Sequence, residues 1–360
     1  MNIKYLQLKG FRNFDELKLE VCNGVNIFIG DNAQGKTNIL ESIYYCCLAK
    51  SHRTNKDKEL INWSFEEGYI SIYVNTNRLD KKIEIKLFKG GKRGIRVNSI
   101  KINKLSEFIG TFTAVIFSPE DLKIVKEAPS FRRRFLDMEL SQISNLYYYN
   151  LVQYNKVLEE KNTLLKKHFR SHMDMYDIYD TQLSQFGSEI IKFRLEYIKT
   201  LNEKGSKIHQ DITSNEENIY LKYVNSIGET NLKEEFIKRL NENRNKDIEK
   251  GISSIGPHRD DFIILINDVD TRVYGSQGQQ RTAILTIKFA SIEILKDRTG
   301  EYPVLLLDDV LSELDESRQR YILKSINNVQ TFITCNSIEN VVNYLDRNIK
   351  IYEVKKGKVT

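Results

Sequence analysis

The chain has 360 residues, 40% of them hydrophobic, and a formal net charge of +6 with a sequence pI near 8.8. That length suffices for two domains or for one large domain with an insertion. No apolar run reaches the roughly 18 to 20 residues of a membrane-spanning helix, and the N-terminus lacks the apolar segment of a signal peptide. We therefore expect neither kind of segment.

The cysteines and histidines indicate no disulfide framework and no zinc site. Cys22, Cys46, Cys47 and Cys335 lack the spacing of either, and five histidines are scattered along the chain. We therefore expect a reduced, cytoplasmic protein. The positive charge is compatible with nucleic acid as a partner, but 49 acidic residues are interleaved with 55 basic ones. A mildly basic, solvated surface explains the charge equally well.

The first third of the chain has the pattern of β-strands. Apolar and polar residues alternate, as in half-buried strands, over residues 17–21, 70–74, 81–88 and 94–97. The last of these continues into IRVNSIKI, which predicts a hairpin that turns at Asn98 and Ser99. VNIFI at 25–29 is continuously apolar, which predicts a strand buried on both faces.

The middle of the chain has the pattern of helices. From about Pro129 to Lys250, helix formers are frequent and apolar residues recur at three- and four-residue spacing. The pattern is too irregular for a long coiled coil. Strand patterns return at 261–268, 304–310, 331–334 and 349–354. The prediction is an α/β head formed by residues 1–125 and 250–360, with a helical arm inserted at 126–249.

A phosphate-binding loop is predicted directly after the apolar strand. GDNAQGKT at 30–37 matches G-x-x-x-x-G-K-[ST], and an amphipathic helix follows it. The glycines would let backbone N–H groups surround a β-phosphate at the helix N-terminus. A plain glycine loop with an exposed lysine is the alternative. The predicted ATP-binding residues of this loop are Gly30, Asp31, Asn32, Ala33, Gln34, Gly35, Lys36, Thr37 and Asn38.

A second acidic motif completes the predicted site. In PVLLLDDVLSELD at 303–315, two acids emerge at the end of a buried strand, where nucleotides bind in open α/β sheets. We expect Asp308, with the Thr37 hydroxyl, to bind Mg²⁺. Asp309 would orient or deprotonate the attacking water, and Lys36 would bind the β- and γ-phosphate oxygens. The alternative is that the two acids merely cap the next helix.

Two stretches resemble motifs of ABC-type ATPases. DDVLSELD at 308–315 resembles the Walker B motif and D-loop, usually D-E-x-x-S-x-L-D, and GSQGQQR at 275–281 resembles the signature L-S-G-G-Q-Q-R. The resemblance implies that signature residues contact the γ-phosphate bound to the other protomer. It assigns the signature in trans to Ser276, Gln277, Gly278, Gln279 and Gln280, and the D-loop to Ser312, Leu314 and Asp315.

Further blocks resemble the RecF family of recombination-repair ATPases. They are LKGFRNF near the N-terminus, KSHRT at 50–54, FSPEDL at 117–122, FRRRFLD at 131–137 and GPHRDDF at 256–262, in that order. Together they span nearly the whole chain. The resemblance implies an ABC/SMC-type ATPase head with a short helical arm, which binds ATP and Mg²⁺.

The same resemblance implies what such a protein does. It would form an ATP-dependent homodimer on DNA, at duplexes and single-strand gap junctions, and hydrolyse ATP slowly with stimulation by DNA. It would act with RecR and RecO in loading RecA. Two alternatives stay open: a nucleotide-binding subunit of a transporter, and a nucleotide-gated scaffold with negligible hydrolysis.

The chain departs from the ABC pattern at several positions. Gln277 replaces the usual first signature glycine, and Asp309 stands where a longer glutamate is usual, which agrees with slow turnover. Cys335 and Asn336 occupy the region of the switch histidine. Glu120 is only a positional candidate for the Q-loop glutamine.

Other basic residues have two interpretations each. Arg53 follows the predicted P-loop helix, where SMC-type heads carry an arginine near the phosphates, although a surface salt bridge is the alternative. Arg132, Arg133 and Arg134 would meet carboxylates rather than DNA phosphate, because the start of a helix disfavours cations. For His258, a structural turn is favoured over catalysis.

Overall fold

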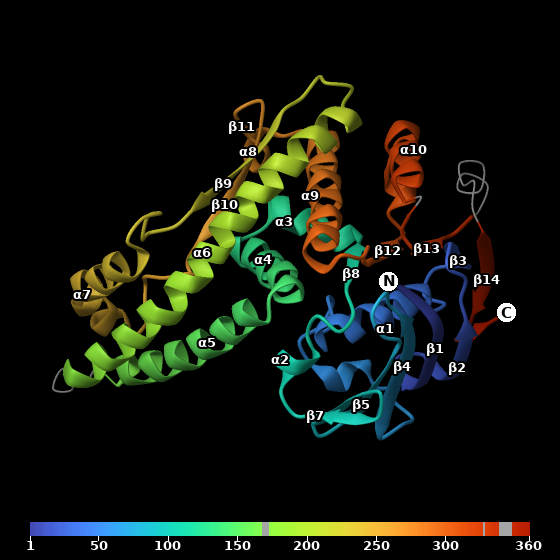
Figure 1. Ribbon diagram of the computed structural model, residues 1–360, viewed down its shortest axis with the longest axis horizontal. Helices are drawn as coiled ribbons and strands as arrows, with labels where there is room; N and C mark the ends of the chain where they lie inside the picture. The colour runs from blue at the N-terminus through green and yellow to red at the C-terminus, as the bar shows by residue number, and fades with distance from the viewer. Residues whose placement is uncertain (168–172, 327, 338–347) are drawn as a thin grey trace. The chain divides into compact units, whose positions relative to one another are not determined.

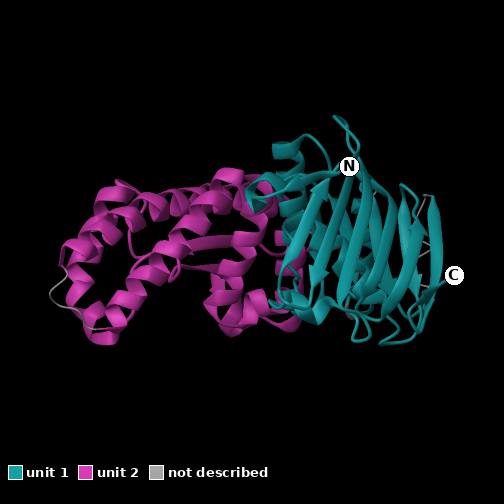
Figure 2. Cartoon of the chain, turned by 90° about the horizontal axis from the view of Figure 1, so that it is seen from below, with its two compact units in different colours: residues 1–121, 288–360 teal, residues 122–287 magenta. Residues whose placement is uncertain are grey.

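A computed structural model describes residues 1–167, 173–326, 328–337 and 348–360 (Figure 1). The chain divides into two compact units, unit 1 with residues 1–121 and 288–360 and unit 2 with residues 122–287 (Figure 2). The sequence placed head and arm boundaries at 125/126 and 249/250, so residues 250–287 lie in the unit that contains the predicted arm. Among the described helices, none combines the length and apolarity needed to cross a membrane.

Unit 1 contains an antiparallel sheet in the order β2-β1-β4-β5-β6-β7. Its strands are β1 (Asn2–Phe11), β2 (Phe14–Glu20), β4 (Glu67–Asn75), β5 (Lys81–Phe88), β6 (Arg93–Val97) and β7 (Ile100–Ile102). Side chains alternate between buried and exposed along β2 and β5, as the sequence predicted for strands with one face in the core. The predicted hairpin is confirmed, because β6 pairs with β7 and both Asn98 and Ser99 have positive φ, 49° and 68°.

The second sheet of unit 1 has the order β15-β14-β3-β13-β12-β8. Its strands are β3 (Val25–Ile29), β8 (Ala114–Phe117), β12 (Val304–Asp308), β13 (Thr331–Cys335), β14 (Ile349–Lys355) and β15 (Lys358–Val359). All pairings except β14–β15 are parallel. The strands β8, β12 and β13 are buried along their whole length, which explains their continuous apolar sequences.

The helices of unit 1 connect and cover these strands. They are α1 (Lys36–Leu48), η1 (Asp57–Leu60), α2 (Leu105–Phe108), η2 (Pro119–Asp121), η3 (Leu311–Glu313) and α10 (Glu316–Ser325), together with the C-terminal part of α9 (Gln277–Thr299). Helix α1 contacts β8, β12 and β13 of the parallel sheet and β4 of the antiparallel sheet. It is therefore buried on almost every side, although the sequence predicted an amphipathic helix.

Unit 2 is mainly helical, with one small antiparallel sheet in the order β11-β10-β9. Its elements are α3 (Leu122–Lys126), α4 (Pro129–Ile143), α5 (Asn145–Lys166), α6 (Met173–Ile212), β9 (Ile219–Val224), α7 (Leu232–Lys250), β10 (Asp261–Ile266), β11 (Val269–Asp270), α8 (Thr271–Tyr274) and the start of α9. The sequence missed β9, although IYLKYV alternates, because helical patterns surround it. The predicted strand at 261–268 pairs with β9 rather than with the parallel sheet.

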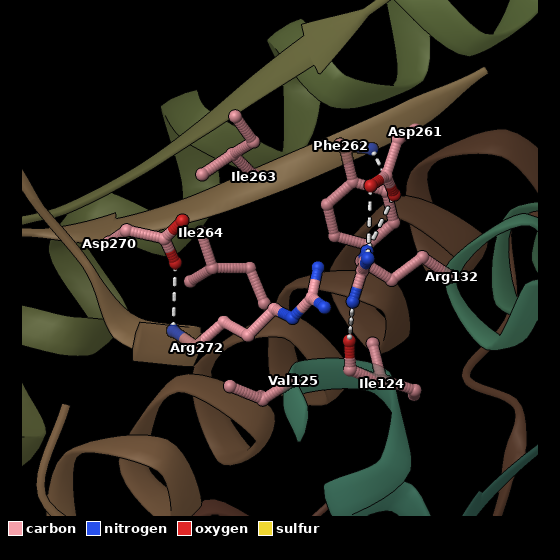
Figure 3. Close-up of a pocket in the computed structure, with 9 residues that line it drawn as sticks. All are labelled: Ile124, Val125, Arg132, Asp261, Phe262, Ile263, Ile264, Asp270 and Arg272. Atoms are coloured by element: carbon pink, nitrogen blue, oxygen red, sulfur yellow. Dashed lines mark hydrogen bonds and ion pairs between the residues drawn. The ribbon is translucent and has the colours of Figure 1, made fainter. Parts of the chain in front are cut away.

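The motifs FRRRFLD and GPHRDDF meet inside unit 2. Arg132 is buried and donates to both carboxylate oxygens of Asp261, at 2.6 and 2.9 Å, and Arg133 donates to the Asp260 carbonyl oxygen at 2.9 Å. The bidentate pair lines a cavity of about 30 Å³, room for about one water molecule (Figure 3). Arg132 therefore meets a carboxylate, as predicted from its place near a helix start.

His258 and Asp260 titrate abnormally because they are buried beside this cluster. Tyr154 donates to Nδ1 of His258 at 2.7 Å, while Nε2 lies 3.0 Å from the Ser253 carbonyl oxygen, so the proton is on Nε2. Burial lowers the pKa of His258 to about 4. Burial also raises the pKa of Asp260 to about 6, against the opposing hydrogen bond from Tyr223. This neutral histidine holds a turn together, as the sequence favoured.

We predict that Asp260→Asn steepens the rise of stability with pH between about 4 and 6. Asp260 binds more protons in the folded than in the unfolded state across that window, so its contribution to stability falls as pH rises. His258 has the opposite sign, because its folded pKa lies below the unfolded value of about 6.5. Without Asp260, the titration of His258 is no longer offset. The slope of the unfolding free energy with pH then increases by up to about 1.4 kcal/mol per pH unit.

Urea unfolding at several pH values between 4 and 6 measures this slope. Asparagine keeps an oxygen that can accept from the Tyr223 hydroxyl, so the packing is preserved. His258→Gln is the matched variant and should flatten the slope instead. A slope in Asp260→Asn equal to that of the parent protein would contradict the abnormal titration of Asp260.

Candidate nucleotide-binding site

The loop between β3 and α1 has the backbone of a phosphate-binding loop. Gly30, Ala33 and Gly35 have positive φ values of 149°, 63° and 117°. Position 35 favours glycine because its φ of 117° is one that L side chains rarely adopt, and a Cβ atom would also lie 2.6 Å from Nδ2 of the Asn13 side chain. Helix α1 then begins at Lys36 with no side-chain cap and no acidic residue in its first turn. The positive end of the helix dipole is therefore available to an anion.

Lys36 points back into this loop and is buried, with 7% of its surface exposed. Its ammonium donates to the carbonyl oxygen of Gly30, to that of Asp31 at 3.0 Å and to Oδ1 of Asn336 at 2.9 Å. All three acceptors are uncharged. The buried cation thus has hydrogen bonds but no ion pair among these contacts, an arrangement that favours a negatively charged ligand.

Thr37 and Asp308 meet across the parallel sheet. The Thr37 hydroxyl donates to Oδ1 of Asp308 at 2.8 Å, and the hydroxyl of Thr334 donates to the same oxygen at 2.9 Å. Burial raises the pKa of Asp308, against these two hydrogen bonds and the charge of Arg53. A cation beside Asp308 would relieve this penalty by stabilising the ionised carboxylate.

Asp309 stands at the end of β12 in a left-handed backbone conformation, with φ 53°. Its amide donates to the Thr334 hydroxyl at 2.9 Å, and the Ser312 hydroxyl donates to its carbonyl oxygen at 2.8 Å and to Oδ1 at 3.1 Å. Further along, Leu314 is buried and Asp315 caps α10 by accepting from the Arg318 amide at 3.0 Å. The predicted D-loop residues thus form a hydrogen-bonded turn between β12 and α10.

The signature-like stretch lies in unit 2, at the start of α9. Ser276 accepts from the Gln279 amide at 3.2 Å, and the Gln279 side chain accepts from the Ser276 amide at 2.9 Å, which is a reciprocal capping box. Gln280 is buried and donates to the carbonyl oxygens of Thr271 and Gly275. Gln277 and Gly278 lie within the first turn of α9.

For Arg53, the structure shows the salt bridge that was one of the two interpretations of the sequence. Its Nη1 donates to Oδ1 of Asn38 at 3.0 Å and lies 3.4 Å from Oε2 of Glu41, so it forms a salt bridge. Its charge opposes the rise that burial causes in the pKa of Asp308. The Arg53 side chain is 41% exposed and therefore accessible to a ligand.

Several residues of the site were not predicted from the sequence. Asn13 donates to the Gln34 carbonyl oxygen and accepts from the Asn38 side chain, both at 2.8 Å. Thr334 bridges Asp308 and Asp309, and buried Glu41 pairs with Arg12. The apolar strand before Thr334 could have indicated its place at the sheet edge. No local pattern could have shown that Asn13 reaches the loop.

The predicted site residues of unit 1 therefore lie at one edge of the parallel sheet. Those that flank the loops after β3 and β12 are Gly30, Asp31, Asn32, Ala33, Gln34, Gly35, Lys36, Thr37, Asn38, Asp308, Asp309 and Ser312. Cys335 is buried there, and burial raises its pKa to about 11, so it is a neutral thiol. Asn336, rather than Cys335, contacts the predicted phosphate-binding lysine.

Comparison with known proteins places the whole chain in one family group. Residues 2–360 match the family model described as the RecF/RecN/SMC N-terminal domain. The chain is 60% identical over 360 residues to the DNA replication and repair protein RecF of Clostridium novyi (strain NT), covering 100% of this chain and 99% of that protein. It is 58% identical over 360 residues to the RecF of Clostridium perfringens (strain SM101 / Type A), with the same coverage.

Solved structures give the same result. One solved structure is that of the recombination mediator protein RecF with ATP, in the RecFOR pathway. The chain superposes on it with a TM-score of 0.92 at 40% identity, covering 99% of this chain and 96% of that chain. An SMC head bound to the C-winged helix domain of ScpA gives a TM-score of 0.58 at 15% identity, covering 100% and 97%. The second likeness shows a shared head fold alone.

Proposed function

Because the chain belongs to the RecF family of the RecF/RecN/SMC group, we propose that it is an ATP-binding protein of DNA replication and repair that dimerises on binding ATP. The observation that carries the proposal is the meeting of Lys36, Thr37 and Asp308 at one sheet edge, beside an uncapped helix N-terminus. The related proteins are named as DNA replication and repair proteins and as a recombination mediator with ATP.

The uncharged hydrogen-bond partners of Lys36 support the binding of a triphosphate. A phosphate oxygen at Lys36 would replace uncharged acceptors with a charged one, and charge-assisted hydrogen bonds are about twice as strong as neutral ones. The backbone N–H groups of the loop and the first turn of α1 would surround the β-phosphate. Asn32, Ala33 and Gln34 form the tip of this loop, so we assign the whole segment 30–38 to ATP.

Magnesium fits the two side chains that meet at the sheet edge. The Thr37 hydroxyl and Asp308 carboxylate are oxygen ligands within 2.8 Å of each other, the ligand type that Mg²⁺ prefers. Among the described residues, no group of three or more His, Cys, Asp or Glu side chains could hold a metal alone. Phosphate oxygens and water would supply the remaining ligands. When bound, the ion would neutralise charge on the β- and γ-phosphates.

We assign the role of catalytic carboxylate to Asp309, and the role of the cation that binds the phosphates during catalysis to Lys36. Asp309 follows the metal-binding acid and is fixed by bonds from Ser312 and to Thr334. It would orient or deprotonate the attacking water. Aspartate is one methylene shorter than the usual glutamate, so we expect slow hydrolysis. Stimulation of this hydrolysis by DNA is proposed from the family.

Dimerisation would bring a second protomer's signature to the phosphates. Ser276 is exposed and its amide and hydroxyl are held by Gln279, so the residue is fixed without being buried. We propose that Ser276, Gln277, Gly278, Gln279 and Gln280 complete the partner's ATP site, with Ser312, Leu314 and Asp315 next to them. ATP would then act as the contact that joins two copies of the chain.

DNA and the other pathway proteins are proposed from the family. The net charge of +6 suits contact with the phosphate backbone, which is largely sequence-independent and weakens with salt. We propose binding to duplex DNA and to single-strand gap junctions. At those gaps the protein would act with RecR and RecO and lead to RecA loading.

We expect Lys36→Ala to lower ATP affinity at least about tenfold, because a charge-assisted hydrogen bond contributes roughly 1.5–3 kcal/mol. Calorimetric titration with Mg²⁺–ATP measures the change, and ATP-dependent retention on gapped DNA should be lost with it. Lys58→Ala removes an exposed lysine of the same unit and is the matched control. Parental ATP affinity in a folded Lys36→Ala protein would refute the assignment of the loop.

Asp309→Asn should leave ATP binding intact and slow hydrolysis about 100-fold or more, the usual contribution of a positioned base. Asparagine tolerates the left-handed backbone at this position, so the turn is kept. Single-turnover hydrolysis is the measurement. Asp268→Asn makes the same change at another aspartate with positive φ, in the exposed β10–β11 turn. Equal rates in Asp309→Asn and the parent protein would exclude Asp309, and no turnover in the parent would favour a nucleotide-gated scaffold.

Mixing two inactive variants tests whether the signature acts in trans. Ser276→Arg should disable, by bulk and charge, the composite site to which it contributes in trans, and Lys36→Ala should disable the other half of a site. In a mixed dimer, one composite site carries both changes and the other carries neither. Random mixing of symmetric dimers therefore leaves at most about a quarter of the sites intact.

The readout is ATPase activity of each variant alone and of the equimolar mixture. Partial recovery on mixing supports a shared site. Crosslinking reports whether mixed dimers form. Mixed dimers that form and stay inactive would contradict independent composite sites and require coupling between the two sites of a dimer.

A further inference from the structure

Two sequence blocks that the proposed function leaves unused converge on one buried carboxylate, that of Glu41 in α1. From the block LKGFRNF, Arg12 donates to Oε2 of Glu41 through Nε at 2.8 Å and to Oε1 through Nη2 at 2.7 Å. From the block KSHRT, the Ser51 hydroxyl donates to Oε1 at 2.6 Å, and Nη1 of Arg53 lies 3.4 Å from Oε2. Each carboxylate oxygen therefore has two donors.

Glu41 is charged despite its burial. Its side chain has no exposed surface, and burial alone would raise its pKa. The hydrogen bonds from Arg12 and Ser51, with the charges of Arg12 and Arg53, lower the pKa below the usual value instead. Arg12 reaches this position with a positive φ of 52°, a strained conformation for a residue with a side chain.

The two arginines use their guanidinium groups differently. Arg12 donates through all three side-chain nitrogens, Nε and Nη2 to Glu41 and Nη1 to the Glu59 carbonyl oxygen at 2.9 Å, so each nitrogen is engaged within the protein. The side-chain bonds of Arg53 to described residues run through Nη1 alone, to Asn38 and Glu41. Its Nε and Nη2 remain for a ligand, and the group is part-exposed.

The backbone around Arg53 is fixed by the same cluster. Ser51 Oγ, which donates to Glu41, accepts from the amide of Arg53 at 2.9 Å and from that of Thr54 at 3.2 Å. Glu41 thus holds the Arg53 segment through two contacts, one to the guanidinium and one through Ser51. Asn38, one turn earlier on α1, provides a third contact by accepting from Nη1 of Arg53.

We propose that Glu41 is a positioning residue of the nucleotide site, which aims Arg53 at the terminal phosphate of ATP. The inference rests on the proposed function, because it takes the loop after β3 as the phosphate site. Nη1 of Arg53 donates at 3.0 Å to Oδ1 of Asn38, which directly follows Thr37 in the predicted phosphate loop, so the guanidinium lies beside the proposed nucleotide site. An arginine aimed there separates ATP from ADP, because ADP lacks the terminal phosphate.

A purely structural role for Glu41 predicts a different result. If Glu41 only holds α1 against the β1–β2 turn, its loss weakens the fold and lowers the affinities for ATP and ADP by the same factor. The ratio of the two affinities, which we call ATP selectivity, then stays constant. A positioning role changes that ratio, and it does so only while Arg53 is present.

The test is a double-mutant cycle of Glu41→Gln and Arg53→Ala, read by titration with Mg²⁺–ATP and Mg²⁺–ADP. Glutamine keeps the size of the side chain and one acceptor but loses the charge. We expect Arg53→Ala to lower ATP selectivity about tenfold or more, the loss of a charge-assisted hydrogen bond. Glu41→Gln should lower it to a similar extent, and the double variant should be no worse than Arg53→Ala.

Three outcomes would overturn the proposal: unchanged selectivity in Arg53→Ala, unchanged selectivity in Glu41→Gln, or losses that multiply in the double variant. Glu139→Gln makes the same change at a buried glutamate of α4 in unit 2 and should leave selectivity unchanged. Lys36→Ala distinguishes a failure of the proposed function from a failure of the role proposed for Glu41. If it binds ATP normally, the proposed function fails; if it loses ATP while Arg53→Ala keeps selectivity, only this inference fails.

A milder variant covers the case in which Glu41→Gln does not fold. Ser51→Ala removes one hydrogen bond to the same carboxylate and one anchor of the Arg53 backbone. It replaces Glu41→Gln in the cycle with Arg53→Ala. We expect a smaller loss of selectivity that disappears when Arg53 is already alanine, and a loss that persists there would count against the proposal.

Discussion

The hydrogen bond from Thr37 to Asp308 depends on the order of strands in the parallel sheet. Strand β13 lies between β3 and β12, so the loops after β3 and β12 reach the same edge one strand apart. Thr334 and Asn336, at the end of β13, fill the gap: one binds Asp308 and the other binds Lys36. Every step of the proposed chemistry requires this edge, because cation, hydroxyl and carboxylate must share one small volume.

Buried charges then fix the shape of that edge. Lys36 is held by uncharged oxygens, whereas Glu41 on the same helix is neutralised by Arg12 and by part of Arg53. A buried charge that has lost its partner is costly, so each of these contacts constrains where the neighbouring backbone can lie. This difference matters for function: Lys36, which has no ion pair among the described residues, is suited to a ligand, and the paired Glu41 carboxylate is suited to holding other groups in place.

The motifs of unit 2 serve the fold more than the chemistry. Arg132 pairs with Asp261, and His258 is neutral and bonded to Tyr154 and Ser253, so neither is free to act on a substrate. The same unit carries Ser276, whose capping box fixes the start of α9 while leaving the residue exposed. Short blocks that resemble one family can therefore mark a ligand site, a buried ion pair or a helix cap, and contacts decide which.

The sequence by itself predicted many of the strands, the glycine loop before α1 and the two acids after β12, because periodicity, glycine spacing and a lysine before a helix are local properties. It could not place β10, whose alternation suits any half-buried sheet; pairing with β9 put that strand in unit 2. Nor could it bring Arg12 and Arg53 to Glu41, since residues 29 and 12 positions away meet only after α1 packs against both sheets. Local patterns encode which groups are present, and only packing decides which of them touch.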